Sequence, residues 1–422
     1  MIQVLAQPKM RFSEFENSYK SSPIASLSKV YDGTHQTPKY VTEGIPFYSV
    51  EHVTRNNFAN TKFISESVFE KESKRVALEK GDILMSRIGD VGTIKYIDWN
   101  VKASFYVSLA LFKCAKEINA EYFSHNLSAP PFQKELWSRM IHVAFPKKIN
   151  LGEISNCDIN YPVNLREQQK IASFLTSVDS KISQLTEKHR LLKEYKKGVM
   201  QQIFSQQLRF KDDDGKAFPE WEEKQFGDVV TWVRTNSLSR DKLTMDIGDI
   251  QNIHYGDIHT KFNGQFRQPL ESVPYVISTE EQKIKNQADY CKQGDLVIAD
   301  ASEDYADIGK SIEIIEARPN SLVAGLHTYI ARPNNIYASG FIGYLFQYDG
   351  IRKQIKKLAQ GISVLGISKK YLEIVIMQIP GYNEQQKIAQ FLQSIDKKID
   401  AVAQQVEQTK QFKKGLLQQM FV

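Results

Sequence analysis

Residues 167–204 read EQQKIASFLTSVDSKISQLTEKHRLLKEYKKGVMQQIF, and residues 384–421 read EQQKIAQFLQSIDKKIDAVAQQVEQTKQFKKGLLQQMF. Without a gap, 19 of the 38 positions are identical at a constant offset of 217 residues. Both copies keep EQQKIA at one end and KKG, QQ and a phenylalanine at the other. Because chance similarity between two helices seldom keeps both ends, we interpret the stretch as an internal duplication.

Both copies have the hydrophobic period of a coiled coil. Their seam residues recur at alternating steps of four and three, which is an a/d pattern with a period of about 3.5 residues. Neither copy contains proline, so each can form one continuous helix of roughly 55–60 Å. The nearest partner for either seam is the other copy, which favours an antiparallel coiled coil; two separate amphipathic helices on their own domains are the alternative. The expected seam is Val178, Ile182, Leu185, His189 and Leu192 in the first copy and Ile395, Ile399, Val402, Val406 and Thr409 in the second.

The composition indicates an ordered chain with room for two or three domains. Its 422 residues are 41% hydrophobic and 11% aromatic, enough to bury a core in each domain. The three cysteines form no CxxC pair, which predicts neither a disulfide framework nor a zinc site and fits a reducing compartment. The start, MIQVLAQPKMRF, has no signal-peptide core, and no uncharged run reaches the about 18 residues of a membrane span. We therefore expect a cytoplasmic protein, whose net charge of +6 permits DNA binding without indicating it.

Each long helix follows a stretch of short strand-like runs and polar loops. GDILMSRIGDVGT at residues 81–93 in the first stretch and GDLVIADASEDYADIGKS at residues 294–311 in the second hold the same place. We expect an α+β protein with two globular α/β domains and two paired helices, a pseudo-two-fold internal repeat. The expected boundaries are 1–160 for the first domain, 161–207 for the first long helix, 208–375 for the second domain and 376–422 for the second long helix.

Antiparallel pairing would place the two domains at opposite ends of a helical rod. Two such heads, separated by one or two turns of DNA at roughly 34 Å per turn, could read two half-sites with an unread spacer between them. The geometry expected from the repeat therefore suits a DNA-reading protein.

Several motifs together resemble one known family. The EQQKIASFL and EQQKIAQFL starts, the KKGVMQQIF and KKGLLQQMF ends, DGTHQTPKY at residues 32–40 and the two GD segments look like a type I restriction-modification specificity subunit. The resemblance spans the whole chain and includes the LRF…FPEWEEKQFGDV junction at residues 208–229. It implies two target recognition domains, each reading half of a bipartite DNA sequence.

The resemblance also implies a division of labour with partner subunits. The long helices would act as spacer and as docking sites for two copies of the modification methyltransferase, which uses S-adenosylmethionine to methylate adenine. Two restriction/motor subunits would complete the complex and cleave unmodified DNA with ATP and Mg²⁺. This chain would then bind none of these cofactors and carry no catalysis.

Basic residues along the two helices could meet an acidic partner surface or spacer phosphates. A solvated flank of the coiled coil would explain them equally well. They are Arg166, Lys170, Lys188, Lys193, Lys196 and Lys197 in the first copy and Lys387, Lys397, Lys398, Lys413 and Lys414 in the second.

Motifs for an enzymatic activity are incomplete. SAPPF at residues 128–132 places Ala129 where an adenine methyltransferase needs an amide or carboxylate, and no glycine-rich loop for S-adenosylmethionine precedes it. Residues 309–311, GKS, lack the earlier glycine of a P-loop, and residues 361–368, GISVLGIS, lack its lysine. His254 and His259 have no third metal ligand nearby in sequence. These observations favour a binding protein over a self-sufficient methyltransferase or nuclease; a coiled-coil scaffold without a DNA role is the third alternative.

DNA readout requires Arg or Lys for guanine and Asn or Gln for adenine, presented on loops. For any single residue, a solvated or turn-forming side chain is the stronger alternative, and Asp300, Glu303 and Asp307 would repel phosphate. Asn56, Asn57 and Tyr48 are weaker candidates. The predicted DNA-binding residues are Thr34, His35, Gln36, Lys39 and Arg87 in the first head and Arg234, Asn236, Ser239, Arg240, Ser302, Tyr305 and Lys310 in the second.

Overall fold

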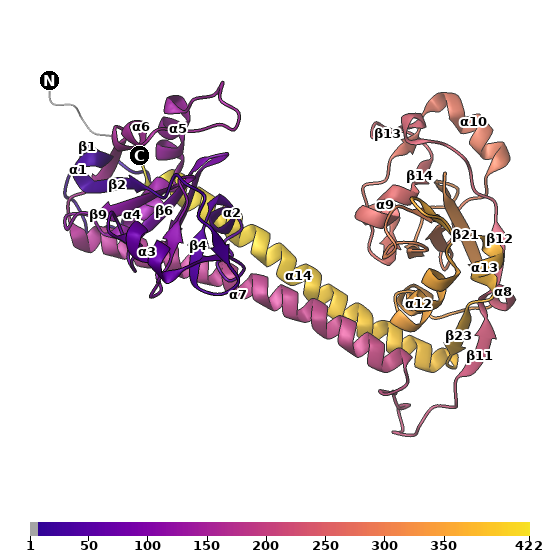
Figure 1. The fold of residues 1–422 in the computed structure, drawn as a ribbon. Helices are drawn as coiled ribbons and strands as arrows, with labels where there is room; N and C mark the ends of the chain where they lie inside the picture. Colours follow the sequence, from indigo (N-terminus) through magenta and orange to yellow (C-terminus); the bar gives the residue numbers. More distant parts are fainter. Residues whose placement is uncertain (1–6) are drawn as a thin grey trace. The chain divides into compact units, whose positions relative to one another are not determined.

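The computed structural model describes residues 7–422, which form two compact units (Figure 1). Unit 1 contains the described residues up to Thr186 together with Ala403–Val422, and unit 2 is Glu187–Val402. Each unit consists of a globular head and parts of both long helices. Within residues 7–422, no helix combines the length and the apolar character that crossing a membrane demands.

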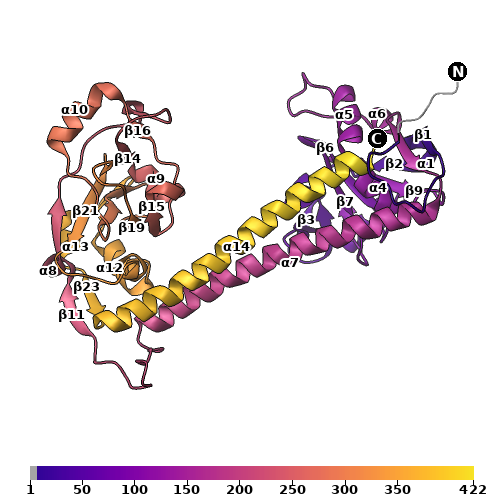
Figure 2. The same cartoon turned by 180° about the vertical axis from the view of Figure 1, so that it is seen from behind.

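The duplicated stretches form the two long helices, α7 (Leu165–Phe204) and α14 (Tyr382–Met420). In unit 1 the first part of α7 packs against the last part of α14, and Lys413 Nζ lies 2.6 Å from Asp179 Oδ1. In unit 2 the last part of α7 packs against the first part of α14, and Lys196 Nζ lies 2.6 Å from Asp396 Oδ1. The two helices therefore run antiparallel in each unit (Figure 2), as the repeat predicts.

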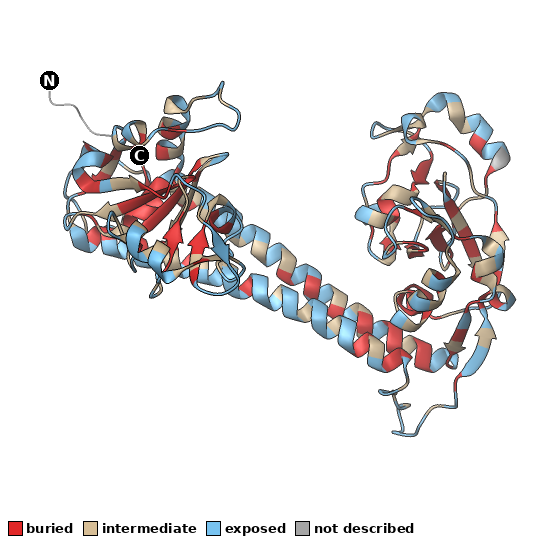
Figure 3. Cartoon of the chain, in the orientation of Figure 1, coloured by how far each residue is buried: buried red, intermediate tan, exposed pale blue. Residues whose placement is uncertain are grey.

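Burial along the helices follows the predicted seam. Buried and exposed positions alternate along both helices in Figure 3. The buried seam residues are Val178, Leu185, Ile395, Ile399 and Val402. The half-buried ones are Ile182, His189, Leu192, Val406 and Thr409.

The two heads share one strand order in spite of their different sequences. The main sheet of head 1 has the order β2-β9-β6-β7, and a second sheet has the order β3-β5-β4-β8. The strands are β2 (Ser28–Asp32), β9 (Leu109–Cys114), β6 (Ile83–Ile88), β7 (Asp90–Tyr96), β3 (Tyr40–Val41), β5 (Lys62–Ile64), β4 (Ile45–Tyr48) and β8 (Ser104–Phe105). The helices of head 1 are α1 (Ile24–Leu27), α2 (Val50–Thr54), α3 (Glu66–Ser73), α4 (Ala120–Leu127), α5 (Pro130–Arg139) and α6 (Leu151–Ser155).

Head 2 repeats this plan and adds one strand. Its main sheet has the order β12-β21-β17-β19-β15, and its second sheet has the order β13-β16-β14-β20. The strands are β12 (Val230–Val233), β21 (Thr328–Pro333), β17 (Leu296–Ala299), β19 (Ser311–Glu316), β15 (Gln265–Arg267), β13 (Leu243–Thr244), β16 (Tyr275–Val276), β14 (Gln251–Ile253) and β20 (Leu322–Ala324). The helices are α8 (Phe226–Val229), η1 (Arg240–Lys242), α9 (Tyr255–Thr260), η2 (Gln268–Leu270), α10 (Ser278–Gln287), α11 (Phe341–Leu345), α12 (Asp349–Leu358) and α13 (Lys369–Glu373).

A short two-stranded sheet joins each head to its long helix. β1 (Tyr19–Pro23) pairs antiparallel with β10 (Asp158–Pro162) directly before α7. β11 (Glu222–Gln225) pairs antiparallel with β23 (Ile376–Ile379) directly before α14. The first and last strands of each head therefore pair with each other at the start of the following long helix. The two heads are thus attached to the repeated helices at equivalent positions.

The EQQK motif anchors each helix start through the same contacts. Glu167 is fully buried and accepts hydrogen bonds from Arg11 Nε at 2.7 Å and Nη2 at 2.8 Å. Glu384 is also fully buried and accepts from Arg209 Nε at 3.2 Å and Nη2 at 3.0 Å. Trp221 Nε1 donates to the same carboxylate at 3.0 Å.

The next residue of the motif closes the turn before each helix. Gln168 donates to the Pro162 carbonyl at 2.8 Å and accepts from the Asn119 backbone N–H. Gln385 donates to the Pro380 carbonyl at 2.9 Å and accepts from the Ala338 backbone N–H. These equivalent contacts give the first two letters of the repeated EQQ a structural reason.

The partners of the two glutamates reveal a second repeat. Arg11 belongs to MRF at residues 10–12, and Arg209 belongs to LRF at residues 208–210. Because each arginine binds the glutamate at a helix start, the two segments are equivalent, although Arg11 lies 156 residues before Glu167 and Arg209 lies 175 residues before Glu384. The Met10 N–H donates to the Gln419 carbonyl near the end of α14, and the Leu208 N–H donates to the Gln202 carbonyl near the end of α7. The segment near the N-terminus therefore packs at the end of α14 as residues 208–210 pack at the end of α7.

A buried histidine makes the folding stability of unit 1 depend on pH. His125 of α4 is 7% exposed, and its Nε2 lies 3.1 Å from Thr176 Oγ1 on α7. Burial and the positive charge of Lys413 on α14 lower its pKa from 6.5 to about 4, although Asp179 on α7 opposes the shift. Thr176 in turn donates to Glu121 of α4. Because the folded pKa lies below the unfolded one, the neutral ring stabilises the fold above pH 6.5, and this stability is lost as the pH falls toward 4.

We expect unit 1 to lose about 2 kcal/mol of unfolding free energy through His125 between pH 7 and pH 5. The check is urea unfolding of the wild-type chain and of His125→Gln at both pH values. The substitution should flatten the pH dependence by that amount because glutamine does not titrate. An identical pH dependence in the two proteins would show that His125 does not carry the effect.

Candidate nucleic-acid interface

A β-hairpin whose first strand directly follows a Gly-Asp pair forms the centre of each candidate interface. β6 and β7 pair Ile83 with Tyr96, and β17 and β19 pair Leu296 with Glu313. This register makes Gly92 and Gly309 equivalent, and both have positive φ angles, +99° and +65°, that favour glycine. Five residues, 87–91, lie between Ser86 and Gly92, whereas nine, 300–308, lie between Ala299 and Gly309. The tip of head 2 is therefore four residues longer.

A second loop runs beside each hairpin tip. In head 1, Lys148 forms a β-bridge with Ile88, and the Ile149 N–H donates to the Arg87 carbonyl at 3.1 Å. In head 2, β18 (Ala301–Ser302) pairs antiparallel with β22 (Leu365–Gly366), and the Ile367 N–H donates to the Asp300 carbonyl at 2.9 Å. Each head therefore presents a paired tip, which we define as residues 87–92 with 140–149 in head 1 and residues 300–309 with 359–367 in head 2.

Both paired tips carry exposed apolar side chains. Val143 and Phe145 in head 1 are 96% and 104% exposed, and Ile362 in head 2 is 101% exposed. Next to Phe145, Lys147 Nζ lies 4.9 Å from the ring centroid of the half-exposed Trp137. Apolar and aromatic groups beside a cationic side chain are suited to contact bases and phosphates together.

The GTHQTPK loop of head 1 meets the paired tip through the backbone. Thr34 N–H donates to the Phe105 carbonyl at 3.0 Å, and Val107 N–H donates to the Thr34 carbonyl at 3.0 Å. Arg87 Nη1 donates to the Val107 carbonyl at 3.2 Å. A glycine is required at position 33, where this loop passes the backbone of Phe105, because a Cβ on residue 33 would lie 2.1 Å from the Phe105 carbonyl oxygen. The two loops predicted from the sequence to read DNA are thus brought together.

The predicted residues of head 1 differ in their accessibility. His35 is exposed and its Nε2 lies 2.7 Å from Asp32 Oδ2; Gln36 and Lys39 are exposed. Thr34 and Arg87 are both 9% exposed, and burial lowers the pKa of the Arg87 guanidinium. The structure therefore gives Thr34 and Arg87 a role in holding the loops. Among the weaker candidates, Asn56 and Asn57 are exposed and Tyr48 is buried.

In head 2 the VRTNSLSR segment is held by α9 and the second sheet. Asn236 Nδ2 donates to Asn252 Oδ1 at 2.8 Å and to the Ala324 carbonyl at 3.0 Å. Arg240 Nη1 lies 2.8 Å from Asp257 Oδ2, and Arg234 forms two 3.2 Å contacts with Asp289.

The remaining groups of this segment form local contacts. Burial opposes ionisation of Asp257, but hydrogen bonds from Arg240 and Lys261 outweigh it and hold the pKa of this carboxyl below its ordinary value. Ser239 is half-buried, and its hydroxyl donates to Asp241. The charge of Arg240 is thus already partly neutralised within the head.

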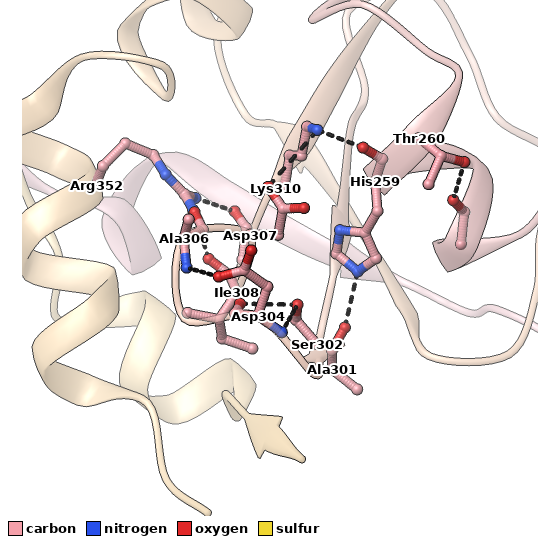
Figure 4. Close-up of polar contacts among 12 residues, drawn as sticks. His259, Thr260, Ala301, Ser302, Asp304, Ala306, Asp307, Ile308, Lys310 and Arg352 are labelled. Carbon is pink, nitrogen blue, oxygen red and sulfur yellow. Dashed lines mark hydrogen bonds and ion pairs between the residues drawn. The ribbon is translucent and has the colours of Figure 1, made fainter. Parts of the chain in front are cut away.

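The hairpin tip of head 2 is organised by internal contacts, which Figure 4 shows. Ser302 is 5% exposed, and its hydroxyl donates to the Asp304 carbonyl at 2.9 Å and accepts from the Asp304 N–H. Lys310 Nζ donates to the His259 carbonyl at 2.6 Å. Tyr305 is 55% exposed, and Lys356 Nζ lies 5.7 Å from its ring centroid. Tyr305 is therefore the predicted residue of this tip that is most open to a ligand.

Sequence reasoning missed the second loop of each paired tip. Residues 140–149 and 359–367 lie just before a short helix, and FPKK at 145–148 combines an aromatic group with two lysines. The combination of an aromatic side chain with two lysines is the sequence signal that could have identified the loop of head 1. Within residues 7–422, no group of three His, Cys, Asp or Glu residues is placed to hold a metal ion.

Comparisons with known proteins agree with the repeated architecture. The family profile described as the Type I restriction modification DNA specificity domain matches residues 23–194 and again residues 219–411. The type I restriction enzyme MjaX specificity subunit of Methanocaldococcus jannaschii is 24% identical over 391 residues, which cover 89% of this chain and 85% of that protein. The EcoKI specificity subunit of Escherichia coli is 28% identical over 157 residues, 37% of this chain and 32% of that protein. The crystal structure of the type I S subunit from M. genitalium has a TM-score of 0.56 at 14% identity and covers 99% of both chains, a similarity of fold.

Proposed function

The chain belongs to the family of type I restriction-modification DNA specificity proteins, and we propose that it reads a bipartite, asymmetric DNA target for a methyltransferase and restriction complex. The observation that carries the proposal is one framework built twice with different tips. The strand orders, helix anchors and paired tips of the heads correspond, whereas the tips differ in length and in sequence. Two similar frames with unlike tips are suited to two different half-sites.

The long helices support a docking role for two copies of one partner. Lys181 and Lys398, and Lys197 and Lys414, are identical, exposed pairs at the repeat offset. By contrast, Lys170, Lys196, Lys387 and Lys413 form ion pairs within the chain. The exposed pairs give each repeat the same basic surface, which two methyltransferase subunits could bind equivalently. We further propose two restriction/motor subunits in the full complex.

Chemistry belongs to the partners in this proposal. S-adenosylmethionine would serve the methyltransferase, and ATP and Mg²⁺ would serve the restriction subunits. The chain itself would supply sequence recognition, spacing and assembly.

The test is reconstitution with the candidate methyltransferase subunit. The complex should bind duplex DNA and transfer labelled methyl groups to it, whereas the methyltransferase alone should show no site preference. DNA binding should weaken steeply with salt, because phosphate contacts release counterions. Methyl transfer by the isolated chain would instead identify it as an enzyme.

Phe145 provides a residue-level prediction for head 1. Phe145→Ala should weaken DNA binding by the reconstituted complex about tenfold, because the exposed ring loses its contact with a base. The salt dependence of binding should stay unchanged, since no phosphate contact is removed. Fluorescence anisotropy over a salt series measures both quantities.

Lys147→Ala is the matched control, two residues further along the same loop. It should lower the slope of log K against log salt by about one, because it removes a cation. If Phe145→Ala and wild type bind equally at every salt concentration, the apolar tip does not touch DNA.

A further inference from the structure

One side chain of each head ties a helix to the hairpin tip. In head 2, Arg352 of α12 donates from Nη1 to the Gly309 carbonyl at 2.7 Å and from Nη2 to the Ile308 and Ala306 carbonyls at 2.7 and 3.0 Å (Figure 4). In head 1, Gln133 of α5 donates from Nε2 to the Gly92 carbonyl at 2.8 Å. Its other amide hydrogen goes to the Leu127 carbonyl at 2.7 Å.

The two side chains occupy equivalent positions. α5 and α12 are both ten residues long, and Gln133 and Arg352 are each the fourth residue. Their acceptors, Gly92 and Gly309, are equivalent in the strand register. A Cβ on Gly92 would lie 2.6 Å from Gln133 and 3.0 Å from Leu136, and one on Gly309 would lie 2.5 Å from Ile355. Leu136 and Ile355 are each the seventh residue of their helix, so the close packing is repeated as well.

The choice of side chain matches the length of the tip. The shorter tip of head 1, residues 87–92, receives one hydrogen bond from a glutamine, whereas the longer tip of head 2, residues 300–309, receives three from an arginine. A longer loop has more backbone freedom to lose, and a guanidinium offers several donors in a fixed geometry. Asp300, Glu303, Asp304 and Asp307 in the longer tip would otherwise repel one another, which makes an internal tether more necessary there.

We propose that Gln133 and Arg352 are positioning residues that hold the DNA-reading tips of head 1 and head 2 in their binding conformation. This inference rests on the proposed function, since it assigns how that function achieves its base specificity. Neither side chain needs to touch DNA. A tip that is held in one conformation before DNA binds cannot adapt to a wrong base, whereas a flexible tip can change its conformation to accept one.

The experiment compares Arg352→Ala and Gln133→Ala in the reconstituted methyltransferase complex. Methylation rates are measured on the target and on a panel of DNAs with one substituted base pair in either half-site. Lys353→Ala, the exposed neighbour on α12, is the control. Hydrogen exchange of residues 300–310 and 86–93 reports the order of the two tips directly.

Arg352→Ala should lower discrimination against mismatches in one half-site about tenfold and leave the other within about twofold. Gln133→Ala should do the same for the opposite half-site. Exchange should rise in the tip of the altered head alone. A general loss of stability would affect both half-sites together, so an equal loss at both, or no loss at either, overturns the proposal.

Arg352→Gln and Arg352→Lys keep the proposal testable if the alanine variant folds poorly. Arg352→Gln installs the head 1 residue and should keep the contact with Gly309 while it releases Ala306, so discrimination should fall between wild type and alanine. Wild-type discrimination in both variants would contradict the tether. If the wild-type complex recognises no bipartite target at all, the proposed function fails, and that outcome is separate from the one tested here.

Discussion

Lengthening both long helices by one heptad should increase the recognised spacer by about three base pairs, because seven residues add about 10.5 Å and one base pair spans about 3.4 Å. The insertions belong between Thr186 and Glu187 in α7 and between Val402 and Ala403 in α14, where the boundary of the two units crosses each helix. A heptad keeps the a/d seam in phase, so the helices can still pair. Methylation of sites with the original spacer should fall at least about 100-fold, because one half-site is then out of register.

Methylation mapping of the lengthened chain measures both effects, since it reports half-sites and spacer together. The control is a seven-residue insertion between Asp214 and Gly215, in the polar connection outside both helices, which should leave the motif unchanged. Altered half-sites around the original spacer would contradict the role of the helices as a ruler.

Removing the carboxylate of Glu384 should destabilise unit 2 by about 3–5 kcal/mol, because Glu384→Ala leaves Arg209 without its buried partner. It also leaves Trp221 Nε1 without its acceptor. Glu384 is fully buried, and the Arg209 side chain is 21% exposed. Urea unfolding gives the free energy, and hydrogen exchange of residues 205–225 locates the loss.

Glu220→Ala is the matched control for this prediction. Glu220 contacts the same Arg209 at 3.4 Å, but its side chain is 90% exposed, so its loss should be small. Replacing the pair by Arg209→Met with Glu384→Leu should recover much of the stability, since an apolar pair removes the unpaired charge. A cost below about 1 kcal/mol for Glu384→Ala would refute the anchoring role of the EQQK motif.

The long helices could be predicted from the sequence because their signal is local. The seam at steps of four and three and the repeated EQQKIA start predict helices that the structure places at Leu165–Phe204 and Tyr382–Met420. The second repeat was harder to detect, since MRF and LRF are three residues long and lie 198 positions apart instead of 217. Its meaning appears only when Arg11 and Arg209 are seen on the two buried glutamates.

The candidate reading loops were predictable, but the direction of their side chains was not. Turn residues and the GD starts indicate where the loops lie, because glycine and polar residues mark turns. Arg87 and Ser302 suit DNA contact by residue type, yet Arg87 donates to the Val107 backbone carbonyl of a neighbouring segment and Ser302 to the Asp304 backbone carbonyl of its own loop. Arg352 and Gln133 lie on helices outside any recognisable motif, and only the strand register relates them. Side-chain direction depends on packing between distant segments, which residue type alone does not encode.

We propose above that this chain reads two different half-sites, one with each head. Adenine-methylation mapping of DNA from cells that express the methyltransferase subunit, with and without this chain, tests it most directly. We expect one new motif of two unlike half-sites around an unspecified spacer, present only with the chain. Replacing residues 19–162 by the head of a relative should change one half-site alone. A continuous motif, or no motif from an assembled complex, would contradict it.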